Sequence, residues 1–296
     1  AVCPGTTETP VHDATIEAMM QDGGLSRAEA ERTFLTGKQP TGKIIAADDG
    51  AGGLIGIVGS ENPHDASSAH SNVALEIHGP LVADVLESEL AVAKFSGWRP
   101  SWRAPSLYAA NAGGPLTAQL LTEGAIGRAV IAAVNGTLPG DSIDIAMFYL
   151  SERQVVETLI AAAGRGVAIR LILDPNKDSF GSTHDGVPNR PVATELVRQS
   201  NGVIQVRWYR THGEQFHAKL VLVKHTDQLW LLLGSANLTR RNIGSHNLEA
   251  DVAVTAGRDA SIALDVQRYF DMLWQNDPVT LREYTADFTA YEDQSF

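Results

Sequence analysis

The spacing of apolar and polar residues changes along the chain, and each change marks a predicted element. Residues 152–165 carry apolar side chains three and four positions apart, which predicts an amphipathic helix that ends near Gly166. Residues 144–148 and 167–173 are short apolar runs, which predict a strand on either side of this helix. A strand, a helix and a second strand in this order are typical of an α/β fold with a largely parallel sheet.

The rest of the C-terminal half continues to alternate between helical and strand patterns. Helices are predicted at residues 119–134, 191–199 and 260–274, and strands at residues 203–208, 216–223 and 229–233. The predicted fold class is therefore α/β.

A sequence repeat organises the chain. Residues 59–62 read Gly-Ser-Glu-Asn and residues 234–237 read Gly-Ser-Ala-Asn, an offset of 175 residues (234 minus 59). Other pairs keep this offset to within one residue: Lys43 with Lys219, Asn72 with Asn247, and Trp98 with Trp274. We predict from the repeat two pseudo-symmetric halves, each a mixed, mostly parallel sheet flanked by helices.

The repeat also sets the expected boundaries. Residues 1–98 form the first half, residues 99–118 are a linker rich in Pro, Gly, Ser and Trp, and residues 119–296 form the second half. The first half has no room for a counterpart of residues 144–174, because that segment would fall before residue 1. We therefore expect the first half to be truncated relative to the second.

Composition narrows the class of protein. The 296 residues are 44% hydrophobic and no run of eighteen apolar residues occurs, so we expect a soluble globular protein, cytoplasmic or peripheral to the cell envelope. The net charge of −12 disfavours broad non-specific binding of nucleic acid, which requires a basic surface. Cys3 is the single cysteine, which excludes an internal disulfide and a thiolate metal cluster.

The second half carries a group of residues suited to an anionic substrate. His217 and Lys219 lie two positions apart on a predicted strand and therefore point to the same face. The turn at residues 234–237 follows the next strand and offers a hydroxyl and an amide. A lysine neutralises a phosphoryl oxygen, while serine and asparagine donate hydrogen bonds. A histidine can attack phosphorus or protonate a leaving alcohol near neutral pH.

These residues resemble the motif of the phospholipase D superfamily, which is His-x-Lys, four residues, Asp, then Gly-Ser-x-Asn, usually present twice. Residues 217–219 and 234–237 match it in order and spacing. Residues 62–72, 238–242 and 247–249 are similar to bacterial phospholipase-like and cardiolipin synthase-like members. The resemblance covers most of residues 41–98 and 141–276. It implies a phosphodiesterase in which one histidine becomes a phosphohistidine and another protonates the leaving group, with no metal or organic cofactor.

The chain departs from this motif at two positions. The first copy keeps Lys43, but Thr41 stands where the motif has histidine. In the second copy Lys224 stands where the motif has aspartate. Loss of a general acid costs about 10²–10⁴ in rate, so a weakened or inactive enzyme is the alternative. His64 and His70 are candidates to replace the missing histidine.

The resemblance assigns roles to individual residues. The expected catalytic residues are His217, Lys219, Asn237, Lys43 and Asn62. The expected substrate-binding residues are Ser235, Ser60, Glu249 and Arg240. His217 acts as nucleophile or general acid, the two lysines bind phosphate, and Glu249 is also a candidate to orient the ring of His217.

The expected function is hydrolysis or phosphatidyl transfer on a phospholipid, with peripheral membrane contact. Phospholipid is favoured because the resemblance is to phospholipase-like and cardiolipin synthase-like members and because the acidic chain disfavours DNA. The alternatives are a nuclease of the same superfamily and a catalytically degenerate phosphate-binding protein. The oligomeric state is open.

Overall fold

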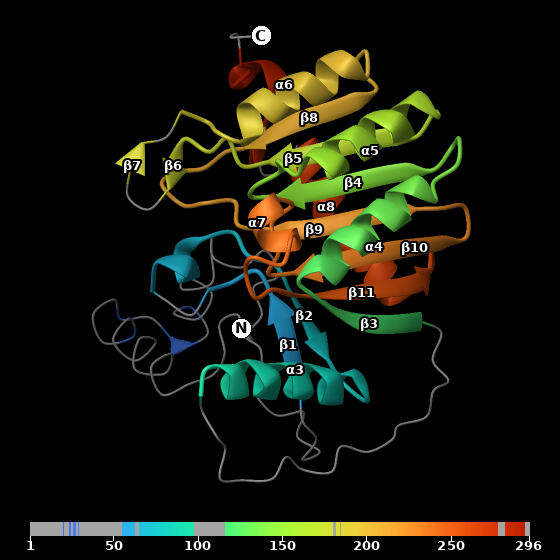
Figure 1. The fold of residues 1–296 in the computed structure, drawn as a ribbon. Helices are drawn as coiled ribbons and strands as arrows, with labels where there is room; N and C mark the ends of the chain where they lie inside the picture. The colour runs from blue at the N-terminus through green and yellow to red at the C-terminus, as the bar shows by residue number, and fades with distance from the viewer. Residues whose placement is uncertain are drawn as a thin grey trace.

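A computed structural model describes residues 55–62, 65–97, 116–179, 182–183, 185–277 and 282–293, together with residues 20, 24, 26, 27 and 29. This part of the chain contains a central mixed sheet with helices on both faces (Figure 1), which confirms the predicted α/β class. The sheet has eight strands in the spatial order β12 (Thr285–Asp287), β8 (Ile204–Tyr209), β5 (Ala168–Leu173), β4 (Ser142–Met147), β9 (Lys219–Lys224), β10 (Gln228–Gly234), β11 (Ala250–Gly257) and β3 (Leu116–Thr122).

The helices of the second half are α4 (Gly124–Asn135), α5 (Arg153–Gly164), α6 (Asn189–Gln199), α7 (Arg240–Ile243) and α8 (Ser261–Gln275). Short elements complete it: β6 (Asp178–Ser179), β7 (Ser182–Thr183) and η2 (Phe288–Ala290). Helix α5 shows how the sequence sets these elements. Val155, Leu159 and Ala162 lie on its buried face, and the chain leaves the helix at Gly166, whose φ of 88° favours glycine.

Parallel pairing is confined to β4, β5 and β8, and the remaining neighbours in the sheet pair antiparallel. The connections explain the difference. Helices α5 and α6 cross between the parallel strands, whereas residues 225–227 alone join β9 to β10, and so short a turn produces an antiparallel hairpin. The sheet is therefore mixed as predicted, but less parallel than predicted.

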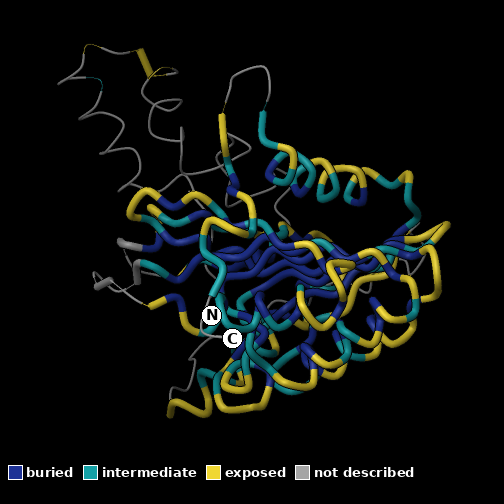
Figure 2. The backbone as a smooth tube through the Cα atoms, turned by 90° about the horizontal axis from the view of Figure 1, so that it is seen from above, coloured by how far each residue is buried: buried dark blue, intermediate teal, exposed yellow. Residues whose placement is uncertain are grey.

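Side chains alternate across the sheet and fill two apolar layers. Along β9, Val221 and Val223 pack in the layer with α4, α5 and α6, while Leu220 and Leu222 pack in the layer with α8. Burial of each such side chain contributes about 1.5–3 kcal/mol. Figure 2 shows the resulting buried sheet between more exposed outer segments.

The described part of the first half consists of β1 (Gly56–Gly59), η1 (Asp65–Ala69), β2 (Ala74–Ile77) and α3 (Leu81–Phe95). Strands β1 and β2 form their own antiparallel pair, and they pack with α3 in the same apolar layer as α8. The counterparts that the repeat predicts around residues 41–43 and at Trp98 lie outside the described residues. The two-half arrangement and its boundaries therefore remain predictions.

The helix predicted at residues 119–134 is wrong in its first turn. Residues up to Thr122 belong to β3, which pairs antiparallel with β11 along its whole length, and the helix α4 begins at Gly124. Ladder hydrogen bonds to β11 outweigh the local spacing of apolar residues here. The other predicted helices and strands of the second half lie within a few residues of the observed ones.

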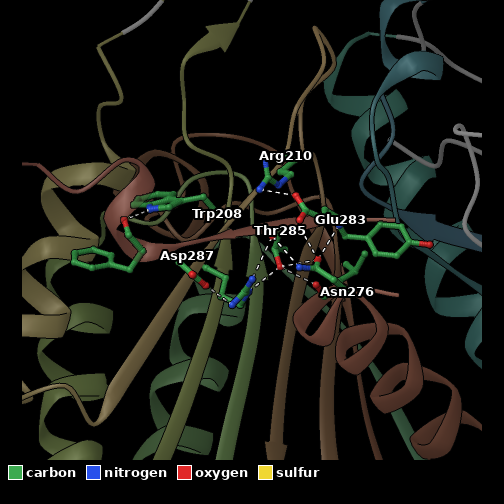
Figure 3. A network of polar contacts seen from close by, with 10 residues as sticks. Trp208, Arg210, Asn276, Glu283, Thr285 and Asp287 are labelled. Atoms are coloured by element: carbon green, nitrogen blue, oxygen red, sulfur yellow. Dashed lines mark hydrogen bonds and ion pairs between the residues drawn. The ribbon is translucent and has the colours of Figure 1, made fainter. Parts of the chain in front are cut away.

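The C-terminal segment covers the β8 edge of the sheet. Strand β12 pairs with β8, and Trp208 Nε1 donates a hydrogen bond of 2.7 Å to the backbone oxygen of Phe288 (Figure 3). Asn276 Oδ1 accepts the backbone N–H of Thr285 at 2.9 Å. These contacts protect an edge that would otherwise expose unpaired backbone groups. Among the described helices, none is both long and apolar enough to cross a bilayer.

Candidate active site

The predicted site residues of the second half meet at one end of the central strands. Lys219 begins β9 opposite the last residue of β4, and Gly234 ends β10 beside the start of β11. His217 comes just before β9, and Ser235 and Asn237 come just after β10. The parallel strands β4 and β5 have their carboxyl ends here, and ligands bind at the carboxyl ends of the strands in open α/β sheets.

His217 is buried and its ring is oriented by the first half. Its Nδ1 lies 3.1 Å from Oδ1 of Asn72, which is 145 residues away in sequence. The amide of Asn72 has one orientation, because its Nδ2 donates to the backbone oxygens of Ser67 (2.8 Å) and His70 (3.3 Å). An amide oxygen only accepts hydrogen bonds, so Nδ1 of His217 carries the proton. The neutral ring therefore holds its lone pair on Nε2, as a nucleophile requires.

Lys219 places a buried amine beside this histidine. Its Nζ donates a hydrogen bond of 2.9 Å to the backbone oxygen of His217 and lies 5.4 Å from the centre of the Phe148 ring. Burial lowers the pKa of Lys219 to about 7, although the buried carboxyl groups of Glu249 and Asp251 act in the opposite direction. An approaching phosphate would favour the charged ammonium form, so the amine is suited to binding an anion.

The two Gly-Ser-x-Asn turns are built alike. Ser60 Oγ donates to Asn72 Oδ1 (3.0 Å) and accepts the backbone N–H of Val73, the residue before β2 (2.9 Å). Ser235 Oγ donates to Glu249 Oε2 (2.5 Å) and accepts the first backbone N–H of β11 (3.0 Å). Asn72 is thus the structural counterpart of Glu249, whereas the sequence offset paired it with Asn247. Both hydroxyls hold their turns in place.

Comparison with known families agrees with this geometry. Residues 135–274 match the family described as cardiolipin synthase, phospholipase D-like domain. This part of the chain, just under half of its length, is similar to a phospholipase D-like domain. No protein of curated function matches the sequence.

Solved structures similar to the chain include the phospholipase D family member Nuc from Salmonella typhimurium, at 18% identity and a TM-score of 0.44 over 60% of this chain and 99% of that one. NucT from Helicobacter pylori aligns at 15% identity and a TM-score of 0.42, over 54% of this chain and 96% of that one. Phosphatidylserine synthase from Haemophilus influenzae Rd KW20 aligns at 14% identity and a TM-score of 0.47, over 73% of this chain and 50% of that one.

The remaining predicted residues of the phospholipase D-like site take varied positions. Asn237 Oδ1 accepts the backbone N–H of Tyr149 (3.1 Å), which ties the second turn to the end of β4. Asn62 is exposed and its backbone N–H donates to a serine of η1 (2.9 Å). Arg240 is exposed at the start of α7. Lys43, like Thr41 and His64, lies outside the described residues.

Nδ1 of His217 lies beside Asn72 Oδ1, so the orientation of His217 by Glu249 stays a prediction. The carboxylate of Glu249 accepts hydrogen bonds from Ser235 and from the side chains of Asn242 and Asn247. These bonds hold the turn, α7 and the start of β11 together. Asn72 is the residue that sequence reasoning missed, and the repeat was its only signal.

The glycine of the second turn is required by close packing. A Cβ at Gly234 would lie 2.3 Å from the backbone oxygen of Ala250 and 2.3 Å from Asp251 Oδ1. Asp251 in turn accepts the backbone N–H of Ala236 (3.0 Å), and burial raises the pKa of Asp251 to about 7. Gly59 is crowded in the same way by β2, where a Cβ would lie 2.7 Å from Ala74 Cβ. The small residue of the motif therefore allows the turn to approach the neighbouring strand.

The departure at Lys224 lies away from this site. Lys224 ends β9, five residues after Lys219 and so roughly 17 Å along the strand. Its Nζ forms an ion pair with the buried carboxylate of Asp144 on β4. Arg170 binds the same carboxylate through two hydrogen bonds of 2.8 Å. The lysine at this motif position is therefore part of a structural ion-pair network.

We expect Asp144→Ala to lower the free energy of unfolding by about 3–5 kcal/mol, since it leaves Lys224 buried without its partner. The double variant Asp144→Leu, Lys224→Met should recover most of this loss, because it removes both buried charges while Arg170 keeps its hydrogen bond to Asp271. Urea unfolding measures the effect, with Arg268→Ala, at an exposed ion pair on α8, as the control expected to change by under about 1 kcal/mol. A loss of catalytic rate in folded Lys224→Met would contradict the structural role.

Two further features of the described residues bear on the site. No cluster of three or more His, Cys, Asp or Glu side chains that could hold a metal occurs there. A cavity of about 940 Å³ lies at the opposite end of the central strands, where His225 pairs with Asp141 at 2.7 Å. None of the motif residues that the structure describes lines that cavity, so the candidate site is identified by the chemistry of its side chains.

Proposed function

We propose that the chain is a phosphodiesterase that acts on phospholipids, by hydrolysis or phosphatidyl transfer, through a phosphohistidine formed on His217. The observation that carries the proposal is the tautomer of His217, which is fixed by Asn72 with the proton on Nδ1 and the lone pair on Nε2. Lys219 lies beside it as a source of positive charge. The match to the cardiolipin synthase-like family supports phospholipid as the substrate class.

The proposed reaction has two displacements at phosphorus. In the first, the lone pair of His217 Nε2 forms a bond to phosphorus, the bond to the leaving alcohol breaks, and the leaving oxygen takes a proton from water. In the second, water or an acceptor alcohol attacks phosphorus and releases its proton to solvent, the nitrogen–phosphorus bond breaks, and the electron pair returns to Nε2. Asn72 Oδ1 accepts a hydrogen bond from Nδ1 throughout, which stabilises the cationic ring of the intermediate. Lys219, together with Lys43 from the first half, is proposed to neutralise the phosphoryl oxygens.

The second candidate is a catalytically degenerate phosphate-binding protein. It is favoured by Thr41, which replaces the histidine of the first motif, and by Asn72, an uncharged residue at the position equivalent to Glu249. An amide stabilises an imidazolium less than a carboxylate does, so this replacement favours a slow first step. The site would then retain Lys219 and the turns that suit an anion.

Turnover of three substrates tests the proposal: phosphatidylglycerol vesicles, bis(p-nitrophenyl) phosphate and single-stranded DNA. We expect release of glycerol from the lipid and of nitrophenol from the diester, with rates unchanged by EDTA. His78→Ala, at an exposed histidine just after β2, is the control and should behave as wild type. Cleavage of DNA without lipid turnover would identify a nuclease instead. Sulfate binding without any turnover would support the phosphate-binding protein.

A further inference from the structure

A second histidine, His70, lies beside His217. The centres of the two rings are 5.8 Å apart and the ring planes are inclined by 42°. His70 follows η1 in the first half, on the turn that also carries Asn72. It belongs to neither copy of the sequence motif, since the first copy has Thr41 at its histidine position.

The segments that carry the two histidines hold each other in place by exchanged hydrogen bonds. The backbone N–H of Gln215 donates to His70 Nδ1 (3.1 Å), and the backbone oxygen of Gln215 accepts the N–H of Ser71 (2.9 Å). From the other side, Asn72 bonds both to His217 Nδ1 and to the backbone oxygen of His70. Each ring is therefore oriented by the segment that carries the other.

The hydrogen bond to His70 fixes its tautomer. A backbone N–H can only donate, so His70 Nδ1 must hold a lone pair and the proton of the neutral ring lies on Nε2. This is the reverse of His217, whose proton lies on Nδ1. The two adjacent rings thus offer complementary groups: a lone pair on one Nε2 and an N–H donor on the other.

We infer that His70 acts as a catalytic residue that donates a hydrogen bond from Nε2 to a phosphoryl oxygen of the diester while His217 attacks phosphorus; this rests on the proposed function. A full proton transfer from neutral His70 would leave an imidazolate, and a doubly protonated ring would lose the bond from Gln215. His70 is therefore a neutral donor that stabilises charge, and the leaving oxygen takes its proton from water. A preorganised donor of this kind is effective because it needs no reorganisation during the reaction.

Kinetics of position 70 test the inference. We expect His70→Ala to lower kcat about 10²–10³-fold, as loss of one preorganised donor does. His70→Gln keeps an N–H near the place of Nε2 and should stay within about tenfold of wild type. His78→Ala is the matched control in the same half, with no expected change. Wild-type kcat in His70→Ala, with turnover lost in His217→Ala, would overturn the role of His70 and leave the proposed function intact.

A second measurement does not depend on turnover. Nitrogen-15 spectra of histidine-labelled protein at pH 7.5 should show His70 with its proton on Nε2, and added sulfate should shift that signal. His70→Ala should weaken sulfate binding by about tenfold or more, the loss expected for a hydrogen bond to a charged group. A proton on Nδ1, or no response of the His70 signal to sulfate, would overturn the inference. The expected sulfate response without turnover of any diester would overturn the proposed phosphodiesterase and support His70 as an anion donor.

Discussion

Replacement of His217 by alanine is expected to lower kcat for bis(p-nitrophenyl) phosphate by about 10⁴–10⁶-fold. Removal of a nucleophile that acts together with other catalytic groups abolishes almost all of the rate enhancement that the group of residues provides. Asn72 would lose the ring that it orients, whereas Lys219 would keep its bond to the backbone oxygen at position 217. The residual rate would come from binding and charge stabilisation alone.

The loss can be separated from unfolding. The ring of His217 packs 5.0 Å from the ring of Phe148, so its removal also changes the packing at the site. Circular dichroism and the melting temperature therefore check that the variant is folded. His78→Ala again provides a histidine-to-alanine change outside the site. Rapid quench of wild type with a labelled diester in alkaline detergent, where a nitrogen–phosphorus bond survives, should trap a covalent adduct that is absent from His217→Ala. A variant that retains kcat within tenfold of wild type would exclude His217 as the nucleophile.

The local parts of this site could be predicted from the sequence. His217 and Lys219 share a face because strand side chains alternate, and the Gly-Ser-x-Asn turn follows one hairpin later. These relations span 20 residues, from 217 to 237, so sequence spacing alone is enough to predict them. Most of the predicted helices and strands of the second half are confirmed for the same reason, although the strands β3, β11 and β12 were not predicted.

The contacts between the halves could not be predicted, because they depend on packing between segments 145 residues apart. The repeat did point to Asn72 but matched it to Asn247, since both are asparagines at an equal offset. The hydrogen bonds show that 12 residues separate Ser60 from Asn72 while 14 separate Ser235 from Glu249. A two-residue difference in loop length therefore hid the true counterpart.

Lys224 shows the same limit for charged residues. Against the sequence motif it is a missing aspartate in the candidate site. In the fold it belongs to an ion pair with Asp144, and the partner is supplied by the neighbouring strand β4. Which strand lies beside β9 follows from the sheet order, and no spacing within the chain reveals that order. A departure from a motif can therefore reflect a change in the core and not in the chemistry.

Replacement of Lys219 by methionine is expected to lower kcat about 10²–10³-fold and, at low pH, to stabilise the fold. The pKa of Lys219 falls from 10.5 to about 7 because of burial, so the folded state disfavours the ammonium that the unfolded chain carries. Below pH 7 both states are protonated and the full cost of the buried charge is present. Between pH 7 and 10.5 the unfolded state binds more protons, and the stability of the wild type rises with pH.

Methionine fills a similar volume without a charge, so the variant should be more stable than wild type by several kcal/mol at pH 6, at about 1.4 kcal/mol for each unit of pKa shift. The difference should shrink as pH rises from 7 toward 10.5. Asp251, whose pKa is also raised to about 7 by burial, is largely protonated at pH 6, and the carboxylate of Glu249 keeps the hydrogen bonds that it accepts from side chains around it. Urea unfolding at pH 6 and pH 9 measures both effects.

Lys94→Met is the matched control for this comparison, because Lys94 is exposed in the last turn of α3 and should show no pH-dependent difference from wild type. Two results would show that burial does not penalise the amine. The Lys219→Met variant could be less stable than wild type at pH 6, or its free energy of unfolding could differ from that of wild type by the same amount at pH 6 and pH 9. The expected result would mean that the charged side chain of Lys219 destabilises the folded state. Such a cost is consistent with a side chain retained for anion binding, since activity and stability commonly oppose each other at functional sites.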